Sequence, residues 1–182
     1  MKKFFIVMLF VLIAVSFTAA KVVGNQNLGG GLQLGLPVDD YFNDAAGTGV
    51  GITLQYNRVM TPEIVLTAST GYILWGGEDY GGASWSWSEI PIRGGVKYFF
   101  SPSFYGIGEL ALHMYMFSVE YDQSYWGLTD YSDSESEFGV SIGVGYEHPI
   151  NDKMSLDASA SYEINDLDYI GVRIALLWGL GK

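Results

Sequence analysis

Six ionisable residues have types and spacings that could do chemistry in this chain: Arg93, Lys97, Glu109, His113, Asp157 and Arg173. Each lies in a segment where large apolar residues alternate with small or polar ones, and each falls on the small or polar side. Opposite charges on one face of paired strands attract one another, whereas a buried charge without a partner is costly. The pattern therefore predicts a set of buried ion pairs.

Hairpin counting predicts two of these pairs as cross-strand or diagonal neighbours: Arg93 with Glu109, and Arg173 with Asp157. The first pair requires a tight turn at Ser101–Ser103, and the second requires a connection at Asn165–Asp168. If such a pair forms, removing Arg93 alone should destabilise the protein, because its partner is left buried and unpaired.

The chain has only two histidines, and an enzymatic interpretation would depend on them. Glu109 could orient His113, which lies four residues along the same strand face. A nucleophilic site also needs a Ser or a similar group within hydrogen-bond reach of the base, and no His-x-Ser spacing occurs near His113. His148 precedes Pro149 at a predicted turn. We therefore expect no catalytic residues and no enzymatic activity.

Two further patterns could bind a ligand. The acidic run from Asp130 to Glu137 offers oxygen ligands to Ca²⁺, but it lacks the glycine and the spacing of an EF-hand loop. The glycine pair in Gly143-Val144-Gly145 lies inside an alternating segment, whereas a nucleotide-binding loop joins a strand to a helix. We expect neither a metal nor a cofactor, and we interpret the acidic run as a solvated loop.

The elements that must position these residues are segments with a period of two, which is the period of a β-strand. We count eight of them, at 31–36, 50–57, 64–75, 89–100, 109–116, 138–146, 154–163 and 169–178. In the sixth, Phe138, Val140 and Ile142 alternate with Gly and Ser. A charge on the lipid-facing side of a membrane strand costs about 2–4 kcal/mol at the midplane, which explains why the charges avoid the bulky face. The sequence predicts an all-β, eight-stranded, antiparallel up-and-down transmembrane β-barrel.

The connections between these segments alternate in length. Short turns are predicted at Asn57–Pro62, Ser101–Ser103 and Asn151–Lys153, and long loops at Pro37–Thr48, Gly76–Ser88 and Tyr121–Ser136. Outer-membrane barrels place their long loops outside the cell, and aromatic residues dominate interface energetics. Candidate loop contact residues are therefore Tyr80, Trp85, Trp87, Tyr125, Trp126 and Tyr131. The alternative is that these rings only anchor the barrel at the membrane interface.

The N-terminus predicts a secretory signal peptide at residues 1–20, followed by a barrel domain at residues 21–182. Lys2 and Lys3 precede an apolar run from Phe4 to Val15, and Thr18-x-Ala20 fits the small-residue rule for cleavage. The run is shorter than the roughly 20 residues of a spanning helix. The chain has 20 acidic against 9 basic residues and no cysteine, which argues against nucleic acid as a partner and excludes disulfides.

One stretch carries a family resemblance. Residues Glu89–Phe100 followed by Ser101–Glu109 resemble the central hairpin of small outer-membrane β-barrel proteins, the family of OmpX and of the outer-membrane protein A transmembrane domain. The last segment resembles the C-terminal signal read by the barrel-assembly machinery, through Tyr169, Gly171, Ile174 and Leu176. The resemblance implies localisation in the bacterial outer membrane, with lipid and this machinery as partners. We also expect a monomer.

The functional prediction is an integral outer-membrane barrel with an occluded polar lumen, because eight strands leave an interior just wide enough for side chains. Its acidic and aromatic loops indicate a structural or surface-interaction role. The alternatives are a small porin-like channel, a lipid-modifying barrel enzyme and a soluble periplasmic lipocalin-like barrel. The soluble barrel fits poorly, because 9 Lys and Arg residues are few for a solvated exterior of this size.

Overall fold

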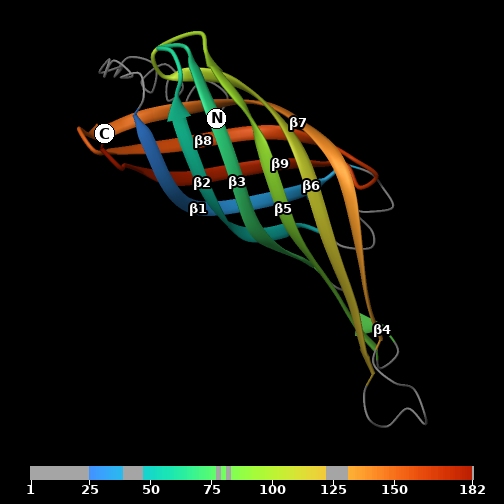
Figure 1. The fold of residues 1–182 in the computed structure, drawn as a ribbon. Helices are drawn as coiled ribbons and strands as arrows, with labels where there is room; N and C mark the ends of the chain where they lie inside the picture. Colours follow the sequence, from blue (N-terminus) through green and yellow to red (C-terminus); the bar gives the residue numbers. More distant parts are fainter. Residues whose placement is uncertain (1–24, 39–46, 77–78, 81–82, 122–130, 182) are drawn as a thin grey trace, which may run out of the picture.

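The computed structural model describes residues 25–38, 47–76, 79–80, 83–121 and 131–181 (Figure 1). The regular structure in these ranges is entirely β-strand. Within the same ranges, no helix has the length and apolar character needed to cross a membrane. The predicted signal peptide and its cleavage site lie outside the described residues.

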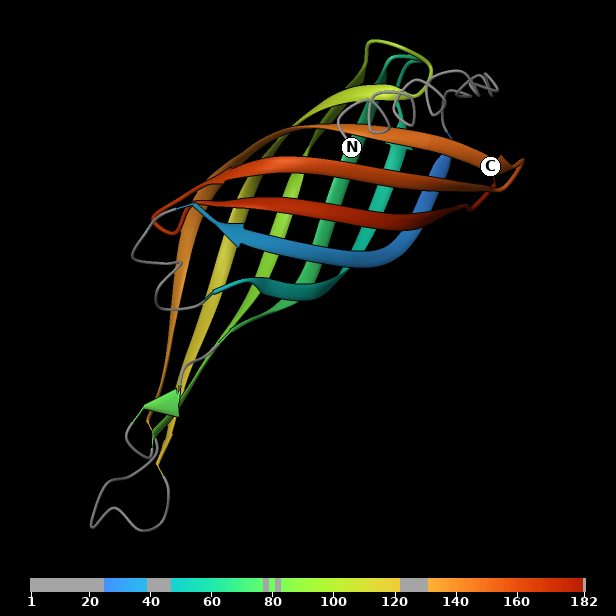
Figure 2. The ribbon, with the colours of Figure 1, turned by 180° about the vertical axis from the view of Figure 1, so that it is seen from behind.

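Nine strands occur in the described part of the chain: β1 (Gln26–Pro37), β2 (Gly49–Val59), β3 (Ile64–Trp75), β4 (Asp79–Tyr80), β5 (Ala83–Phe99), β6 (Phe104–Tyr121), β7 (Tyr131–Asn151), β8 (Met154–Ile164) and β9 (Tyr169–Gly179). All of their pairings are antiparallel. The short strand β4 pairs with β5 only. The other eight strands pair in chain order, and β3 pairs with β5 while β1 pairs with β9. Figure 2 shows β1 in blue beside β9 in red, where the first and last strands of the chain pair. The predicted eight-stranded up-and-down barrel is therefore confirmed.

The register keeps the two faces of the alternation apart around the barrel. Leu32 of β1 lies between Ile52 of β2 and Ile174 of β9, and these three side chains point outward with exposed fractions of 65%, 61% and 53%. The next row contains Gln33 and Arg173, which are both buried inside. Since a shift of one residue would exchange the faces, this distribution fixes the register. The outside of the barrel is apolar, and the middle of its interior is polar.

Side chains fill the interior in three layers. A polar middle layer contains the buried charged residues, and an apolar cluster lies at each end of the barrel. At the end with the short turns the cluster consists of Val59, Val65, Phe99, Tyr105 and Ile107. At the other end it consists of Ile73, Trp75 and Tyr169, with Trp87 and Leu167 packed against it.

Glycines make room for the largest of these rings. A Cβ atom added at Gly35 or Gly49 would overlap the indole ring of Trp75, and one added at Gly145 would overlap the ring of Tyr105. The small face of the alternation is therefore required where an aromatic ring from another strand lies against the backbone.

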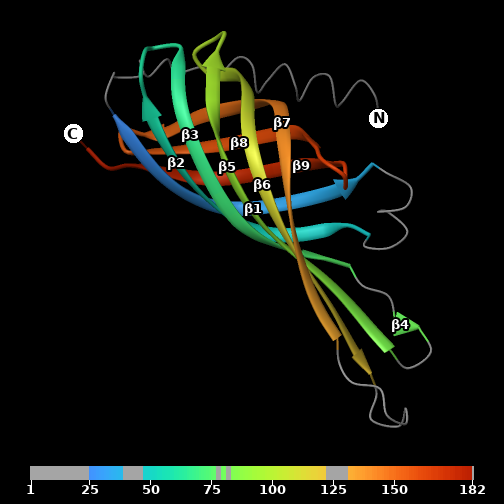
Figure 3. The same cartoon turned by 45° about the vertical axis from the view of Figure 1, so that its right-hand side comes forward.

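Two predicted long loops are wrong in part. Residues 79–80, 83–88 and 131–136 are strand, because β5, β6 and β7 continue past the barrel as one sheet, and β4 pairs with the start of β5 (Figure 3). The pairing of β3 with β5 ends at Trp75 opposite Trp87, and the pairing of β8 with β7 ends at Ile164 opposite Val140. We call residues 83–88, 116–121 and 131–136 the protruding sheet. In residues 83–88 and 131–136, serine alternates with aromatic or acidic residues, which is the period of a β-strand. These segments lack the apolar face by which the barrel strands are recognised in the sequence.

Candidate functional site

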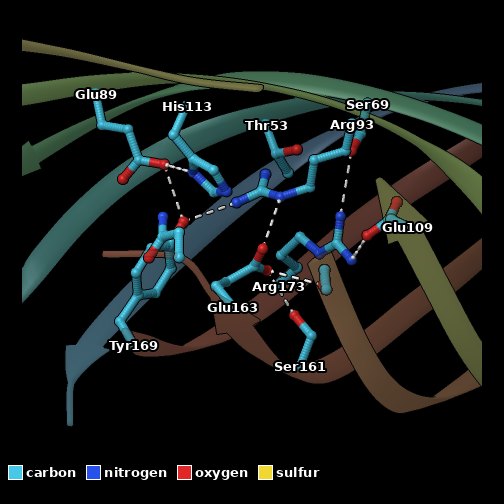
Figure 4. A network of polar contacts seen from close by, with 12 residues as sticks. Thr53, Ser69, Glu89, Arg93, Glu109, His113, Ser161, Glu163, Tyr169 and Arg173 are labelled. Carbon is cyan, nitrogen blue, oxygen red and sulfur yellow. Dashed lines mark hydrogen bonds and ion pairs between the residues drawn. The ribbon is translucent and has the colours of Figure 1, made fainter. Parts of the chain in front are cut away.

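The middle layer of the lumen is held by ion pairs that cross the barrel (Figure 4). The Nε atom of Arg93 on β5 lies 3.3 Å from Oε2 of Glu163 on β8. Its Nη2 atom donates to the Tyr169 hydroxyl at 2.9 Å. Ser141 and Ser161 donate to the other oxygen of Glu163 at 3.1 and 2.9 Å, so both oxygens of this buried carboxylate are bound.

Lys97 and Arg173 each form an ion pair with a different carboxylate. Nζ of Lys97 lies 2.6 Å from Oδ2 of Asp157, and the Tyr105 hydroxyl donates to Oδ1 of the same residue at 2.9 Å. Nη2 of Arg173 lies 2.7 Å from Oε2 of Glu109. All of these side chains are buried, and none of the pairs joins adjacent strands.

The predicted pairs, Arg93 with Glu109 and Arg173 with Asp157, are not the ones that form. Arg93 is opposite Ala111, and Glu109 is opposite Gly95, so the predicted diagonal position is correct. Each arginine instead contacts a carboxylate on a strand that is not its neighbour. Hairpin counting considers adjacent strands only, whereas closing a narrow barrel brings side chains from opposite walls within reach.

His113 is oriented by Glu89, and the predicted contact with Glu109 is not formed. Its Nδ1 atom lies 2.7 Å from Oε1 of Glu89, which also accepts the Tyr169 hydroxyl at 3.0 Å. Trp75 donates to the second oxygen of Glu89 at 3.2 Å. The histidine therefore belongs to the same buried network as Arg93. Among the described side chains, no group of three His, Asp or Glu residues is arranged to hold a metal ion.

Glu89 and Glu163, which are not among the predicted pairing partners, also fall on the small or polar side of their segments. Their positions in the alternation were the available signal. Tyr169 belongs to the predicted assembly signal and to the small side of the last segment. Its ring is fully buried in the lumen, and its hydroxyl joins Arg93 to Glu89. Of the other residues in that signal, Gly171 lies on the lumen side, whereas Ile174 points outward. Leu176 is partly exposed.

One face of the protruding sheet continues the lumen face and is aromatic. Trp87 on β5 is opposite Phe117 on β6, which is in turn opposite Asp133 on β7. The rings of Trp87 and Phe117 have centroids 4.9 Å apart, and those of Trp85 and Phe117 are 5.4 Å apart. Glu135 lies next to Asp133 on the same face of β7, and both are exposed. Rings and carboxylates therefore lie side by side on one surface.

The opposite face of the protruding sheet is rich in serine. The hydroxyls of Ser86 and Ser118 are 2.6 Å apart, and Ser118 is opposite Ser132. On the same outward side closer to the barrel, Ile92 is opposite Leu112, which is opposite Phe138. Along the outward side of β5, β6 and β7, apolar residues therefore give way to serines. This change indicates where the strands leave an apolar environment and enter water.

The candidate contact residues have different environments. Trp85 and Tyr131 are exposed by 43% and 55%. Trp87 is partly buried against the apolar cluster of the barrel, and Tyr80 lies in β4. Tyr125 and Trp126 lie outside the described residues. The Tyr131 hydroxyl donates to Asp133 at 3.1 Å, and this hydrogen bond raises the pKa of Tyr131.

The end of the barrel with the protruding sheet is acidic. The sequence has neither Lys nor Arg at residues 37–49, 76–88, 116–137 and 164–169, which include all the connections at this end. The same ranges carry Asp79, Glu120, Asp133, Glu135, Glu137, Asp166 and Asp168. Asp39, Asp40, Asp44, Glu78, Asp122 and Asp130 also fall in these ranges of the sequence but lie outside the described residues. This end therefore attracts cations and repels anions.

Comparisons with known proteins agree with this architecture. A family model described as "Outer membrane protein beta-barrel domain" matches residues 5–176. No curated protein sequence matches the chain. The attachment invasion locus protein Ail of Yersinia pestis is similar in structure, with a TM-score of 0.62 and 16% identity over 87% of this chain and 99% of that one.

Two further solved structures are similar. Ail in complex with the heparin analogue sucrose octasulfate has a TM-score of 0.62 and 14% identity, over 87% of this chain and 99% of that one. A major outer membrane protein from Thermus thermophilus has a TM-score of 0.53 and 11% identity, over 85% of this chain and 99% of that one. At these identities, the likenesses establish a shared fold.

Proposed function

The chain belongs to the outer membrane protein β-barrel domain family, and from this premise we propose that it is a surface-interaction protein that acts through its protruding sheet. The barrel is an integral outer-membrane protein, and its apolar outer face contacts lipid. The end with the short turns faces the periplasm in such barrels, and the opposite end faces the exterior. The protruding sheet is thus the part that meets other molecules.

The observation that carries this proposal is the contrast between the filled lumen and the extended strands. Buried ion pairs between two apolar clusters occupy the interior, which supports a closed barrel rather than a channel. Three strands continue beyond the lipid-facing rows and present Trp85 and Tyr131 to solvent. Aromatic residues of this kind anchor interfaces.

We also propose that the chain is not an enzyme. His113 is fully buried, and its Nδ1 atom is bound to Glu89, so a substrate in water or in lipid has no access to it. The heparin analogue in the Ail complex is a sulfated sugar. We do not extend that ligand class to this chain, because the exposed end has no Lys or Arg in its connections.

The proposal also covers how the barrel is inserted into the membrane and how many chains it contains. We propose that the barrel-assembly machinery recognises β9 through Tyr169, Gly171, Ile174 and Leu176 during insertion. We propose a monomer, because each of the eight barrel strands has both of its neighbours within the same chain. A closed barrel needs no second subunit to cover a sheet edge.

A shortened barrel tests the surface role. Residues 76–86 are replaced by Asn-Gly, which joins Trp75 to its partner Trp87, and residues 117–133 are replaced in the same way, which joins Met116 to Ser134. We expect the variant to insert and to keep its heat-modifiable gel migration. Bacteria displaying the full chain should adhere to protein-coated surfaces or to cultured cells, and bacteria displaying the shortened barrel should not. Equal adhesion by both strains would contradict the proposal.

A further inference from the structure

We propose that the aromatic and acidic face of the protruding sheet binds a basic polypeptide segment rich in arginine. This inference rests on the proposed surface role and names the class of partner. The face is defined by Trp85 and Trp87 on β5, Phe117 on β6, and Asp133 and Glu135 on β7.

On this face, aromatic rings lie beside carboxylates, and a guanidinium group can contact both at once. Phe117 has Trp87 as its cross-strand partner on one side and Asp133 on the other. Directly opposed side chains have Cβ atoms about 4.5–5.5 Å apart. An arginine laid on the rings therefore has a carboxylate within hydrogen-bond reach. Arginine combines stacking on aromatic faces with a fork of donors that matches a carboxylate, and lysine lacks this combination.

The charge of this face has no partner in the described part of the chain. The contacts of Asp133 are with the Tyr131 hydroxyl and the Ser134 amide, both of which are neutral. Arg93, Lys97 and Arg173 are buried and bound to other carboxylates. Arg58 is exposed near the short-turn end of β2, at the opposite end of the barrel. An external cation is therefore the complement of Asp133 and Glu135.

The backbone of β7 favours an extended ligand. Residues 131–139 of β7 pair with β6, and the pairing of β7 with β8 starts only at Val140. The other edge of the strand at 131–136 thus offers N–H and C=O groups that a peptide in a β conformation can pair with. Acidic residues at such an edge can also serve only to prevent aggregation, and measurements of peptide binding separate these two roles.

The test uses the full chain folded in detergent and a fluorescent nonapeptide of arginine, with nonapeptides of lysine and of glutamate for comparison. Fluorescence anisotropy should show binding of the arginine peptide, weaker binding of the lysine peptide and none of the glutamate peptide. The double variant Asp133→Asn/Glu135→Gln should bind the arginine peptide about tenfold more weakly, since each exposed charge pair contributes modestly. Trp85→Leu should weaken it about threefold through loss of the ring face.

The matched control is Glu63→Gln/Asp152→Asn, which removes two exposed charges at the opposite end of the barrel. It should leave binding unchanged. An equal loss in the control, or equal affinity for the arginine and lysine peptides, would show attraction to net charge alone and would overturn the inference. If the arginine peptide does not bind while adhesion still depends on the protruding sheet, the surface role stands and only this partner class fails. Gel heat shifts verify that each variant is folded.

Discussion

The guanidinium of Arg173 reaches the carboxylate of Glu109 across the lumen, with 2.7 Å between Nη2 and Oε2. Arg173 lies on β9 and Glu109 on β6, and these strands do not pair. Arg173 also donates to the Ser69 hydroxyl of β3 at 3.2 Å. One side chain thus connects three separate parts of the wall, and the barrel depends on contacts that are remote in sequence.

Glu109→Gln should destabilise the barrel by about 3–5 kcal/mol, because Arg173 then remains charged and buried without its carboxylate. The free energy of unfolding is measured by urea titration in lipid vesicles, with tryptophan fluorescence as the signal. Glu63→Gln is the control, because this exposed residue should change stability by only about 0.5 kcal/mol. The double variant Glu109→Gln/Arg173→Met should recover part of the loss. Additive losses in the double variant would mean that the two groups do not interact.

Lys97→Met should cost more than Tyr105→Phe, although both side chains bind Asp157. The first change leaves a buried carboxylate without its cation, which costs about 3–5 kcal/mol. The second removes one hydrogen bond from a carboxylate that keeps its cation, which costs about 1–3 kcal/mol. The same urea titration ranks the two variants, and the reverse order would contradict this account of the site.

A side chain at Gly35 should destabilise the barrel, whereas one at Gly94 should not. A Cβ atom at Gly35 overlaps the ring of Trp75, and a Cβ atom at Gly94 meets nothing within 4 Å. Overpacking of this kind costs about 1–3 kcal/mol. Gly35→Ala and Gly94→Ala therefore form a matched pair for measurements of the gel heat-shift temperature. Equal heat-shift temperatures in the two variants would show that the Trp75 ring can move aside without a loss of stability.

The folded chain should give no large, stable conductance steps in a planar bilayer. The lumen contains buried ion pairs with apolar clusters on both sides, and the interior of an eight-stranded barrel is just wide enough for such side chains to fill. A general porin in the same bilayer serves as the positive control. Reproducible open-channel steps from pure, monomeric, heat-modifiable protein would contradict the closed lumen.

The sequence was sufficient to predict the strands and their faces, because a period of two is a local property. Val65 and Ile73 fall on the same side of their segment as Thr67, Ser69 and Gly71, and both are buried. The partners of the interior charges could not be predicted, because Arg93 meets Glu163 only once the barrel has closed. The extension of β7 was missed for another reason: Ser and acidic residues at 131–137 keep the strand period but resemble a solvated loop.

The last prediction concerns where the membrane ends along the outer wall. Leu110 points outward near the middle of β6 and is 73% exposed, so Leu110→Lys places a charge in lipid and should cost about 2–4 kcal/mol. Ser132 also points outward, opposite Ser118 in the serine rows of the protruding sheet. Because water surrounds that position, Ser132→Lys should change the free energy of unfolding by only about 0.5 kcal/mol. Urea titration in vesicles compares the two variants. A large cost at Ser132 would place the protruding sheet against lipid, and its aromatic face would then be a membrane anchor rather than a binding surface.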